Sequence, residues 1–197
     1  MTELVKGYSA QDQERFLDEP AKRPGRTEFV RDRARVIHSA ALRRLAAKTQ
    51  VAVPWENDFQ RTRLSHSLEC AQIGRELGES LGADPDLLET ACLSHDMGHP
   101  PFGHAGERGL EQAMVGSGGF DHNGHALRIL SRLERAYPGW PGLNLTWETL
   151  EGLVKHNGPL MNKDGQGTRG PVPQPILDYC AIHDLEIDTF ASLEAQV

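Results

Sequence analysis

Three histidines and two carboxylates fall within fourteen residues of this 197-residue chain, from Ser94 to Glu107. The segment reads Ser-His-Asp-Met-Gly-His-Pro-Pro-Phe-Gly-His-Ala-Gly-Glu. Neutral imidazoles and carboxylates are ligands of borderline divalent metal ions, and further His and Glu side chains beside such an ion can move protons or hold a negatively charged substrate. The segment therefore indicates metal-assisted hydrolysis.

His95 and Asp96 are adjacent in this segment. A His-Asp pair alone is weak evidence, and a second one stands at His183-Asp184. The first pair differs in context, because it ends an apolar helical pattern, precedes a Gly/Pro-rich turn and is followed by further histidines. That context favours a site over a structural His-Asp pair.

His66 is the best further donor to an ion at His95 and Asp96. Adjacent helical residues point about 100° apart, so these two can share an ion only if another helix supplies ligands across the gap. Histidine with carboxylate favours manganese, iron, cobalt, nickel or zinc over magnesium, but cellular supply can override that preference and the metal's identity stays open. Three protein ligands leave positions for water and a substrate oxygen.

Basic residues precede His66. Arg63 precedes His66 by three residues and so lies on nearly the same face of the predicted helix. The preceding predicted helix ends with Arg43, Arg44 and Lys48. The planar guanidinium gives bidentate hydrogen bonds to phosphate oxygens. We expect Arg63 to reach an anionic ligand, whereas a solvated helix end is the favoured interpretation for Arg44 and Lys48.

His122 and His125 open a predicted helix whose N-cap is Asp121. A helix start favours an anion, but from the residues alone the two histidines belong equally well to a surface or to a site. The remaining histidines have no comparable neighbours and are expected to be structural or exposed: His38, His156 and His183.

Helices must position these residues, and no convincing strand is present in the pattern. Apolar spacing, N-caps and Gly/Pro breaks predict helices over 27–48, 61–81, 84–98, 105–114, 121–135 and 146–156. Two apolar stripes on 61–81, with Leu64, Leu68 and Ala71 on one and Ile73, Leu77 and Leu81 on the other, predict a central helix. Residues 157–175 predict a long loop. A last helical segment from Thr189 to Val197 has no glycine, proline or basic last turn to end it, so we expect the sequence to stop within a helix. The expected class is all-α.

The composition excludes several classes of protein. A net charge of −7 disfavours a general nucleic-acid binder, which usually carries a basic surface. Cys70, Cys92 and Cys180 form no CxxC pattern and predict reduced thiols. No apolar signal core or membrane-spanning run is found, so we expect a soluble cytoplasmic protein.

Taken together, several segments resemble the HD-domain superfamily of metal-dependent phosphohydrolases, and within it the deoxyguanosine triphosphate triphosphohydrolase-like branch. The resemblance rests on four segments: residues 26–51, the run Arg61-Thr-Arg-Leu-Ser-His-Ser-Leu-Glu69, residues 95–107, and Phe120-Asp-His-Asn123. It implies an HD-domain helical bundle over 26–197, after an N-terminal extension over 1–25. It also implies a divalent metal cofactor (Mn, Mg, Co, Fe or Zn) and a homo-oligomer in the full-length form. The implied reaction is hydrolysis of a deoxynucleoside triphosphate to deoxynucleoside and inorganic triphosphate.

The resemblance also implies a role for each matching residue. His66, His95 and Asp96 match metal ligands, and Arg63 matches a phosphate contact. Gln50 matches a residue beside the deoxyribose, and His99 a substrate-binding position that is asparagine in some members. His104 and Glu107 match an acid/base pair, and His122 a further active-site histidine.

A fourth metal ligand of the family is an aspartate that follows a segment like Ser192-Leu-Glu-Ala-Gln-Val197. We therefore expect this chain to be the N-terminal portion of a longer enzyme, with metal binding weakened in the portion alone. Two alternatives stay open: another HD phosphohydrolase acting on nucleoside monophosphates or cyclic nucleotides, and an inactive metal- or nucleotide-binding module.

Overall fold

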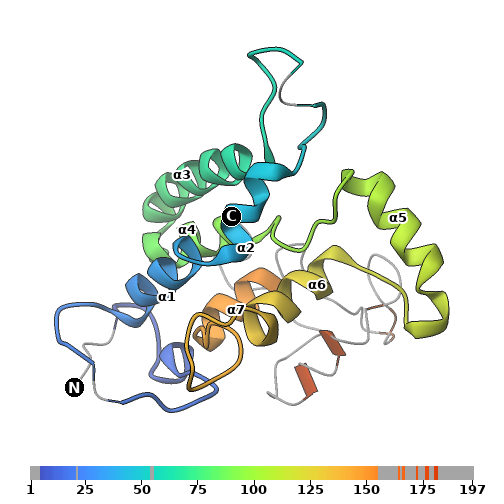
Figure 1. Cartoon of the computed structure of the whole chain (residues 1–197). Helices are drawn as coiled ribbons and strands as arrows, with labels where there is room; N and C mark the ends of the chain where they lie inside the picture. Colours follow the sequence, from blue (N-terminus) through green and yellow to red (C-terminus); the bar gives the residue numbers. More distant parts are fainter. Residues whose placement is uncertain are drawn as a thin grey trace.

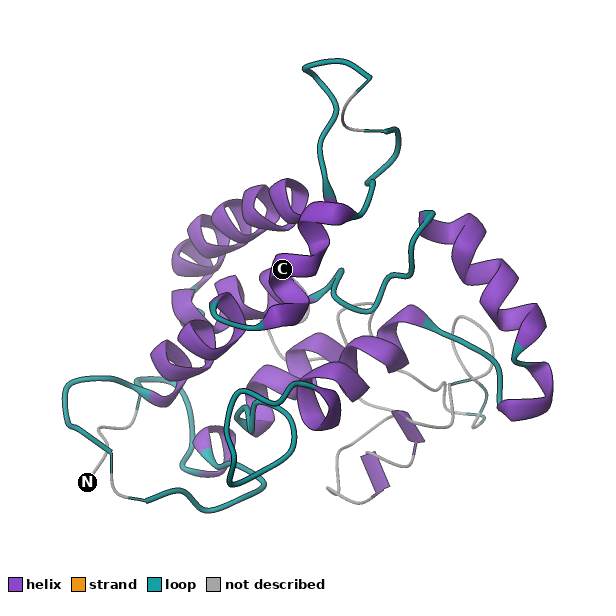
Figure 2. Cartoon of the chain, in the orientation of Figure 1, coloured by secondary structure: helices purple, strands orange, loops and turns teal. Residues whose placement is uncertain are grey.

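The computed structural model describes residues 5–20, 22–53, 56–154, 164, 166, 172, 176–177 and 180–181. Helices joined by loops make up this part of the chain, which contains no β-strand (Figures 1 and 2). The α-helices are α1 (Glu28–Ile37), α2 (Ala40–Arg44), α3 (Arg63–Leu81), α4 (Pro85–Ser94), α5 (Gly103–Ala113), α6 (His122–Arg128) and α7 (Trp147–Val154). The expected all-α class is confirmed.

Short helical turns complete the described architecture. These are η1 (Gln11–Gln13), η2 (Leu45–Ala47), η3 (Val115–Ser117) and the π-helical turn η4 (Ile129–Leu133). The helix predicted over 121–135 is thus α6 continued by η4. The predicted end of the 146–156 helix, most of the 157–175 loop, and the helical piece from Thr189 lie outside the described residues.

The single helix predicted over 27–48 is wrong, because the chain breaks between α1 and α2 at Ser39. The Ser39 hydroxyl accepts the Leu42 N–H at 3.1 Å and so begins a new helix. The carboxylate of Glu134 accepts the N–H groups of Ala40 and Ala41, at 3.2 and 2.7 Å. Apolar spacing continues across this break, so it does not reveal the competing cap.

α3 meets α4 through a face of small residues. Ser67, Ala71, Gly74 and Gly78 are buried on it. A Cβ atom at Gly78 would lie 1.6 Å from Leu88 Cδ1, so only glycine allows this approach of the two helices. The tight α3–α4 contact therefore depends on the absence of side chains.

The predicted central position of α3 is wrong for most of its apolar residues, although Ala71 is buried and Leu64 packs against the core. Leu68, Ile73, Leu77 and Leu81 are between 50% and 58% exposed. A helix of period 3.6 can bury only part of its circumference against one neighbour, and here the small-residue face occupies that position. α4 is more central, since it packs against α1, α3 and α7.

The hydrophobic core is formed by side chains of α2, α4, α6 and α7 and of the segments that join them. Leu93 and Met97 are almost fully buried at its centre. Other members include Leu42, Leu45, Ala126, Leu127, Leu130, Leu143, Leu145, Leu150 and Leu153. This core fixes the end of α4, and with it the His95-Asp96 pair, against the start of α6.

A buried ionic network ties the N-terminal segment to α1 and α7. Arg15 donates to Asp32 at 2.5 Å and to Glu28 at 2.7 Å. Asp32 is fully buried and also accepts from the Thr146 N–H and the Thr149 hydroxyl, at 2.8 and 2.9 Å. The network satisfies buried charges that would otherwise be costly.

Within the described residues, no helix has both the length and the apolar character that crossing a membrane requires.

Candidate active site

The turn between α4 and α5 carries most of the predicted site residues. His95 is the C-cap of α4, and Phe102, the N-cap of α5, has a left-handed φ of 67°. A Cβ atom at Gly98 would lie 1.8 Å from the carbonyl oxygen of His122. Glycine at position 98 therefore lets this turn pack directly on the start of α6, which brings His99 and His122 together.

His95 and Asp96 place a ring nitrogen and a carboxylate oxygen side by side. His95 Nδ1 lies 2.7 Å from the Cys92 carbonyl oxygen, so it carries a donating N–H and leaves Nε2 free. That Nε2 atom is 3.4 Å from Asp96 Oδ1. Bond lengths near 2.1 Å at a tetrahedral angle place two ligand atoms about 3.4 Å apart. The donor set and its spacing fit a divalent ion.

His66 on α3 faces His95 across the gap between the two helices. The ring centroids are 5.4 Å apart with an interplanar angle of 70°. Burial lowers the pKa of His66 below 6.5; Asp96 opposes this, while the charges of His95 and Arg63 add to it. A neutral imidazole is the form that binds a metal ion.

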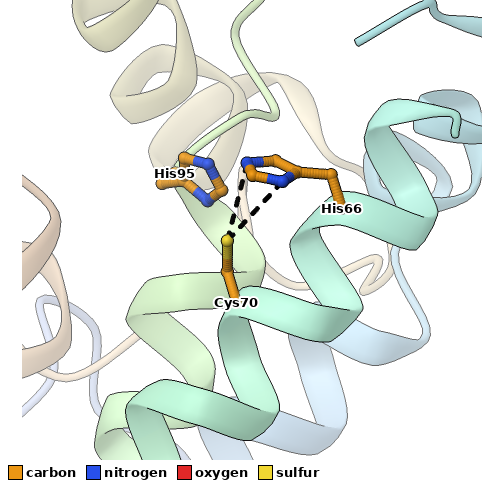
Figure 3. Close-up of side chains that lie close together, drawn as sticks. All are labelled: His66, Cys70 and His95. Atoms are coloured by element: carbon orange, nitrogen blue, oxygen red, sulfur yellow. Dashed lines mark hydrogen bonds between the residues drawn. The ribbon is translucent and has the colours of Figure 1, made fainter.

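Cys70 also belongs to this cluster, although sequence reasoning assigned it no role. Its sulfur and one nitrogen each of His66 and His95 lie within 4.8 Å of one another (Figure 3). The available signal was its spacing of four residues from His66, which places both on one face of a helix.

Arg63 is buried and binds Asp96. Its Nη1 atom donates to Asp96 Oδ2 at 2.9 Å, and its Nε atom has no partner among the described residues. Its backbone N–H donates to the Lys48 carbonyl oxygen at 2.9 Å. The guanidinium thus stands beside Asp96 with an N–H group that has no partner among the described residues, and its phosphate contact stays a prediction.

Gln50 lies near the start of α3, because Thr49 and Thr62 form an antiparallel bridge. The buried Oε1 atom of Gln50 has no hydrogen-bond donor within the described part of the chain. A buried acceptor without a donor is unusual, and a bound ligand is one way to satisfy it.

Lys48 differs from the solvated residue that the sequence predicts. Its ammonium group is half-buried and donates to the His99 carbonyl oxygen at 2.5 Å. Burial, aided by the charges of Arg44 and Arg63, lowers the pKa of Lys48 to about 8. The expectation holds for Arg44, which is exposed. The reach of Lys48 across to the α4–α5 turn requires tertiary packing, which helix periodicity does not encode.

Glu107 joins His104 and His122. Its Oε2 accepts from His104 Nδ1 at 3.0 Å, and its Oε1 accepts from His122 Nδ1 at 2.6 Å and from the His122 N–H at 3.0 Å. Burial alone would raise the pKa of Glu107, but the hydrogen bonds from both histidines outweigh it and lower the pKa to about 2. The ionised carboxylate holds Nδ1–H on both rings and leaves both Nε2 atoms available for proton transfer.

His99 lies between the Glu107 cluster and Asp96. Its ring stacks on His122 with centroids 4.0 Å apart, and its Nε2 lies 3.4 Å from Asp96 Oδ1. Burial and the neighbouring His122 and Arg63 lower the pKa of His99 to about 3, so its ring is neutral at pH 7.

Two further histidines lie apart from these contacts. His125 packs beside Phe120, with ring centroids 5.4 Å apart, and its pKa is lowered first by burial and then by nearby cations. His38 is exposed, while His156 and His183 lie outside the described residues. Of the pair on α6, it is therefore His122 that shares contacts with the other candidate residues.

Known proteins match this chain along most of its length. The HD domain family model matches residues 63–185. A protein named deoxyguanosinetriphosphate triphosphohydrolase-like protein from Rhizobium meliloti (strain 1021) is 60% identical over 90% of this chain. A protein of the same name from Rhizobium etli (strain CIAT 652) is 59% identical over 88% of this chain. A protein of the same name from Agrobacterium fabrum (strain C58) is 58% identical over 87% of this chain. The chain spans 44%, 43% and 42% of these relatives, respectively.

Proposed function

Since this chain belongs to the HD domain family, we propose that it carries the metal and proton-transfer residues of a hydrolase. The proposed reaction converts a deoxynucleoside triphosphate into deoxynucleoside and inorganic triphosphate, with water attacking the α-phosphorus. The printed names of the relatives support this substrate class.

One observation carries the proposal: Glu107 binds His104 and His122 at the point where His99 faces Asp96. Proton-transfer groups and candidate metal ligands are thereby joined in one site. Phosphoester hydrolysis needs both, because charge on the phosphoryl oxygens must be neutralised and the leaving oxygen protonated.

His66, His95 and Asp96 would hold a divalent ion, which when bound supplies a Lewis acid for phosphoryl oxygens and water. When protonated at both ring nitrogens, His104 would deliver the Nε2 proton to the departing 5′-oxygen, while Glu107 accepts the Nδ1 hydrogen bond and fixes the ring. His122 is held by the other oxygen of the same carboxylate, and its Nε2 atom would accept or donate a further proton.

The basic residues and Gln50 would bind the substrate. Arg63 would direct its unsatisfied N–H toward the phosphates, and His99 would contact the substrate beside Asp96. Gln50 Oε1 would accept a hydrogen bond from the 3′-hydroxyl of the deoxyribose. Arg63 Nε and Gln50 Oε1 are buried and have no hydrogen-bond partner among the described residues.

Product analysis tests the reaction. The purified protein is incubated with each of the four deoxynucleoside triphosphates and Mn²⁺ or Mg²⁺ in isotopically labelled water. We expect equal amounts of deoxynucleoside and inorganic triphosphate, with the label in the triphosphate because attack occurs at the α-phosphorus. His104→Ala is the matched control, expected to abolish product.

Two outcomes contradict the proposal. Orthophosphate as the sole inorganic product identifies another HD phosphohydrolase reaction. Thermal stabilisation by a nucleotide without any turnover identifies a binding module.

A further inference from the structure

Cys70 faces the two histidines of the candidate metal site from within α3. Its sulfur lies 3.5 Å from Nε2 and 3.7 Å from Nδ1 of His66, one helical turn earlier. Figure 3 shows the thiol directed into the space between His66 and His95. The three side chains come from two facing helices and converge on one point.

The spacing of the ligand atoms matches a shared metal ion. Zinc–sulfur and zinc–nitrogen bonds of about 2.3 and 2.05 Å at a tetrahedral angle place the two ligand atoms about 3.6 Å apart. The distance from Cys70 Sγ to His66 Nε2 is 3.5 Å. An S–H···N hydrogen bond explains that single distance, but it does not explain why His95 converges on the same sulfur.

His95 supplies the second observation. Its Nδ1–H is held by the Cys92 carbonyl oxygen at 2.7 Å, which fixes the ring and leaves Nε2 as the ligand atom. Asp96 Oδ1 stands 3.4 Å from that Nε2. His95 thus lies near both the Cys70 thiol and the Asp96 carboxylate.

We infer that Cys70 contributes a thiolate ligand to the ion held by His66 and His95, and that this site prefers a thiophilic ion, zinc before magnesium or manganese. Thiolate and imidazole are soft and borderline donors, whereas magnesium favours oxygen. The thiol proton passes to the buffer as the sulfur–metal bond forms. The inference rests on the metal site of the proposed function and is independent of the substrate.

Cobalt(II) spectroscopy tests this ligand directly. The purified protein is titrated with Co²⁺ without nucleotide, and the near-ultraviolet thiolate-to-cobalt charge-transfer band is recorded. We expect the band in the natural protein, its displacement by Zn²⁺, and its loss in Cys70→Ser. Competition titration should show at least a tenfold loss of Zn²⁺ affinity in that variant and less than a threefold change for Mn²⁺.

Cys92→Ser is the matched control, because Cys92 lies on α4 next to the site and its partly buried thiol packs against Gly74. The control variant should retain the band. A band that persists in Cys70→Ser, or is absent when cobalt binds the natural protein, overturns the inference. Failure of the natural protein to bind cobalt or zinc overturns it as well.

A second measurement needs no variant. Bound Zn²⁺ should slow alkylation of Cys70 in the natural protein by at least tenfold, read by peptide mass spectrometry, while Mg²⁺ should not. Equal alkylation with and without Zn²⁺ contradicts the inference. A charge-transfer band without nucleotide hydrolysis would contradict the proposed reaction but support the thiolate ligand. Triphosphate release without the band would support the reaction and contradict the thiolate ligand.

Discussion

Glu107→Gln removes the charge that holds His104 and His122. The side chain of Glu107 is 15% exposed and accepts three hydrogen bonds, two from imidazole rings and one from the backbone. A glutamine keeps one acceptor oxygen but turns an N–H group toward one of the histidine Nδ1–H donors. The variant therefore loses a charge-assisted bond and gains an opposed pair of donors.

The magnitude follows from the pKa of Glu107, lowered from 4.5 to about 2. At about 1.4 kcal/mol per pH unit, ionised Glu107 contributes about 3 kcal/mol to the free energy of unfolding. We expect Glu107→Gln to lower that free energy by about 2 kcal/mol at pH 7, since the remaining amide oxygen preserves part of the bonding.

The loss should depend on pH. A carboxyl group whose pKa is lower in the folded state stabilises the fold above its unfolded pKa of about 4.5, and this contribution disappears as the pH falls through about 2. The difference between the two proteins should thus be nearly constant from pH 5 to 7 and fall by about 2 kcal/mol, to near zero, by pH 3.

Urea unfolding followed by circular dichroism at pH 7, 5 and 3 measures this difference. Glu111→Gln is the control, because Glu111 lies one turn later on α5 and is exposed, so its substitution should change stability by less than about 0.5 kcal/mol. A loss below about 0.5 kcal/mol for Glu107→Gln at pH 7, or a loss that does not shrink at pH 3, would refute the reasoning.

Three further predictions concern the metal, the turn and the N-terminal network. Asp96→Ala should empty the metal site, whereas His104→Ala should keep the metal and lose triphosphate release; equal metal loss by elemental analysis would contradict the assigned roles. Gly98→Ala should cost about 3 kcal/mol or more in urea unfolding, because its Cβ meets backbone at 1.8 Å; a cost below about 1 kcal/mol would count against the close packing. Asp32→Ala should destabilise the fold by about 3 kcal/mol, because the buried Arg15 then keeps only Glu28 as a carboxylate partner, and a midpoint within error of the natural protein's would argue against the buried pair.

Local features of the site could be predicted from the chain alone. Asp84 caps α4, accepting the N–H groups of Asp86 and Leu87 at 2.9 and 3.0 Å, and Asp121 caps α6. Both follow from side chains that reach a backbone only two or three residues away. The assigned roles of the site residues remain predictions until metal binding and turnover are measured.

Longer-range features could not be predicted in this way. Apolar spacing located α3 but did not select its buried face, since Gly78 and its small neighbours, rather than Leu77 and Leu81, face α4. Lys48 reaches His99, fifty-one residues away, and no periodic signal encodes that contact.

The sequence by itself determined the helical class, the caps at Asp84 and Asp121, and the density of histidine and carboxylate side chains, because these depend on residues within about one helical turn of one another. Only the tertiary structure decided that Glu107 holds His122 and that Cys70 faces His95. Such contacts depend on how closely α3, α4 and α6 approach, and that distance is set by packing at Gly78 and Gly98.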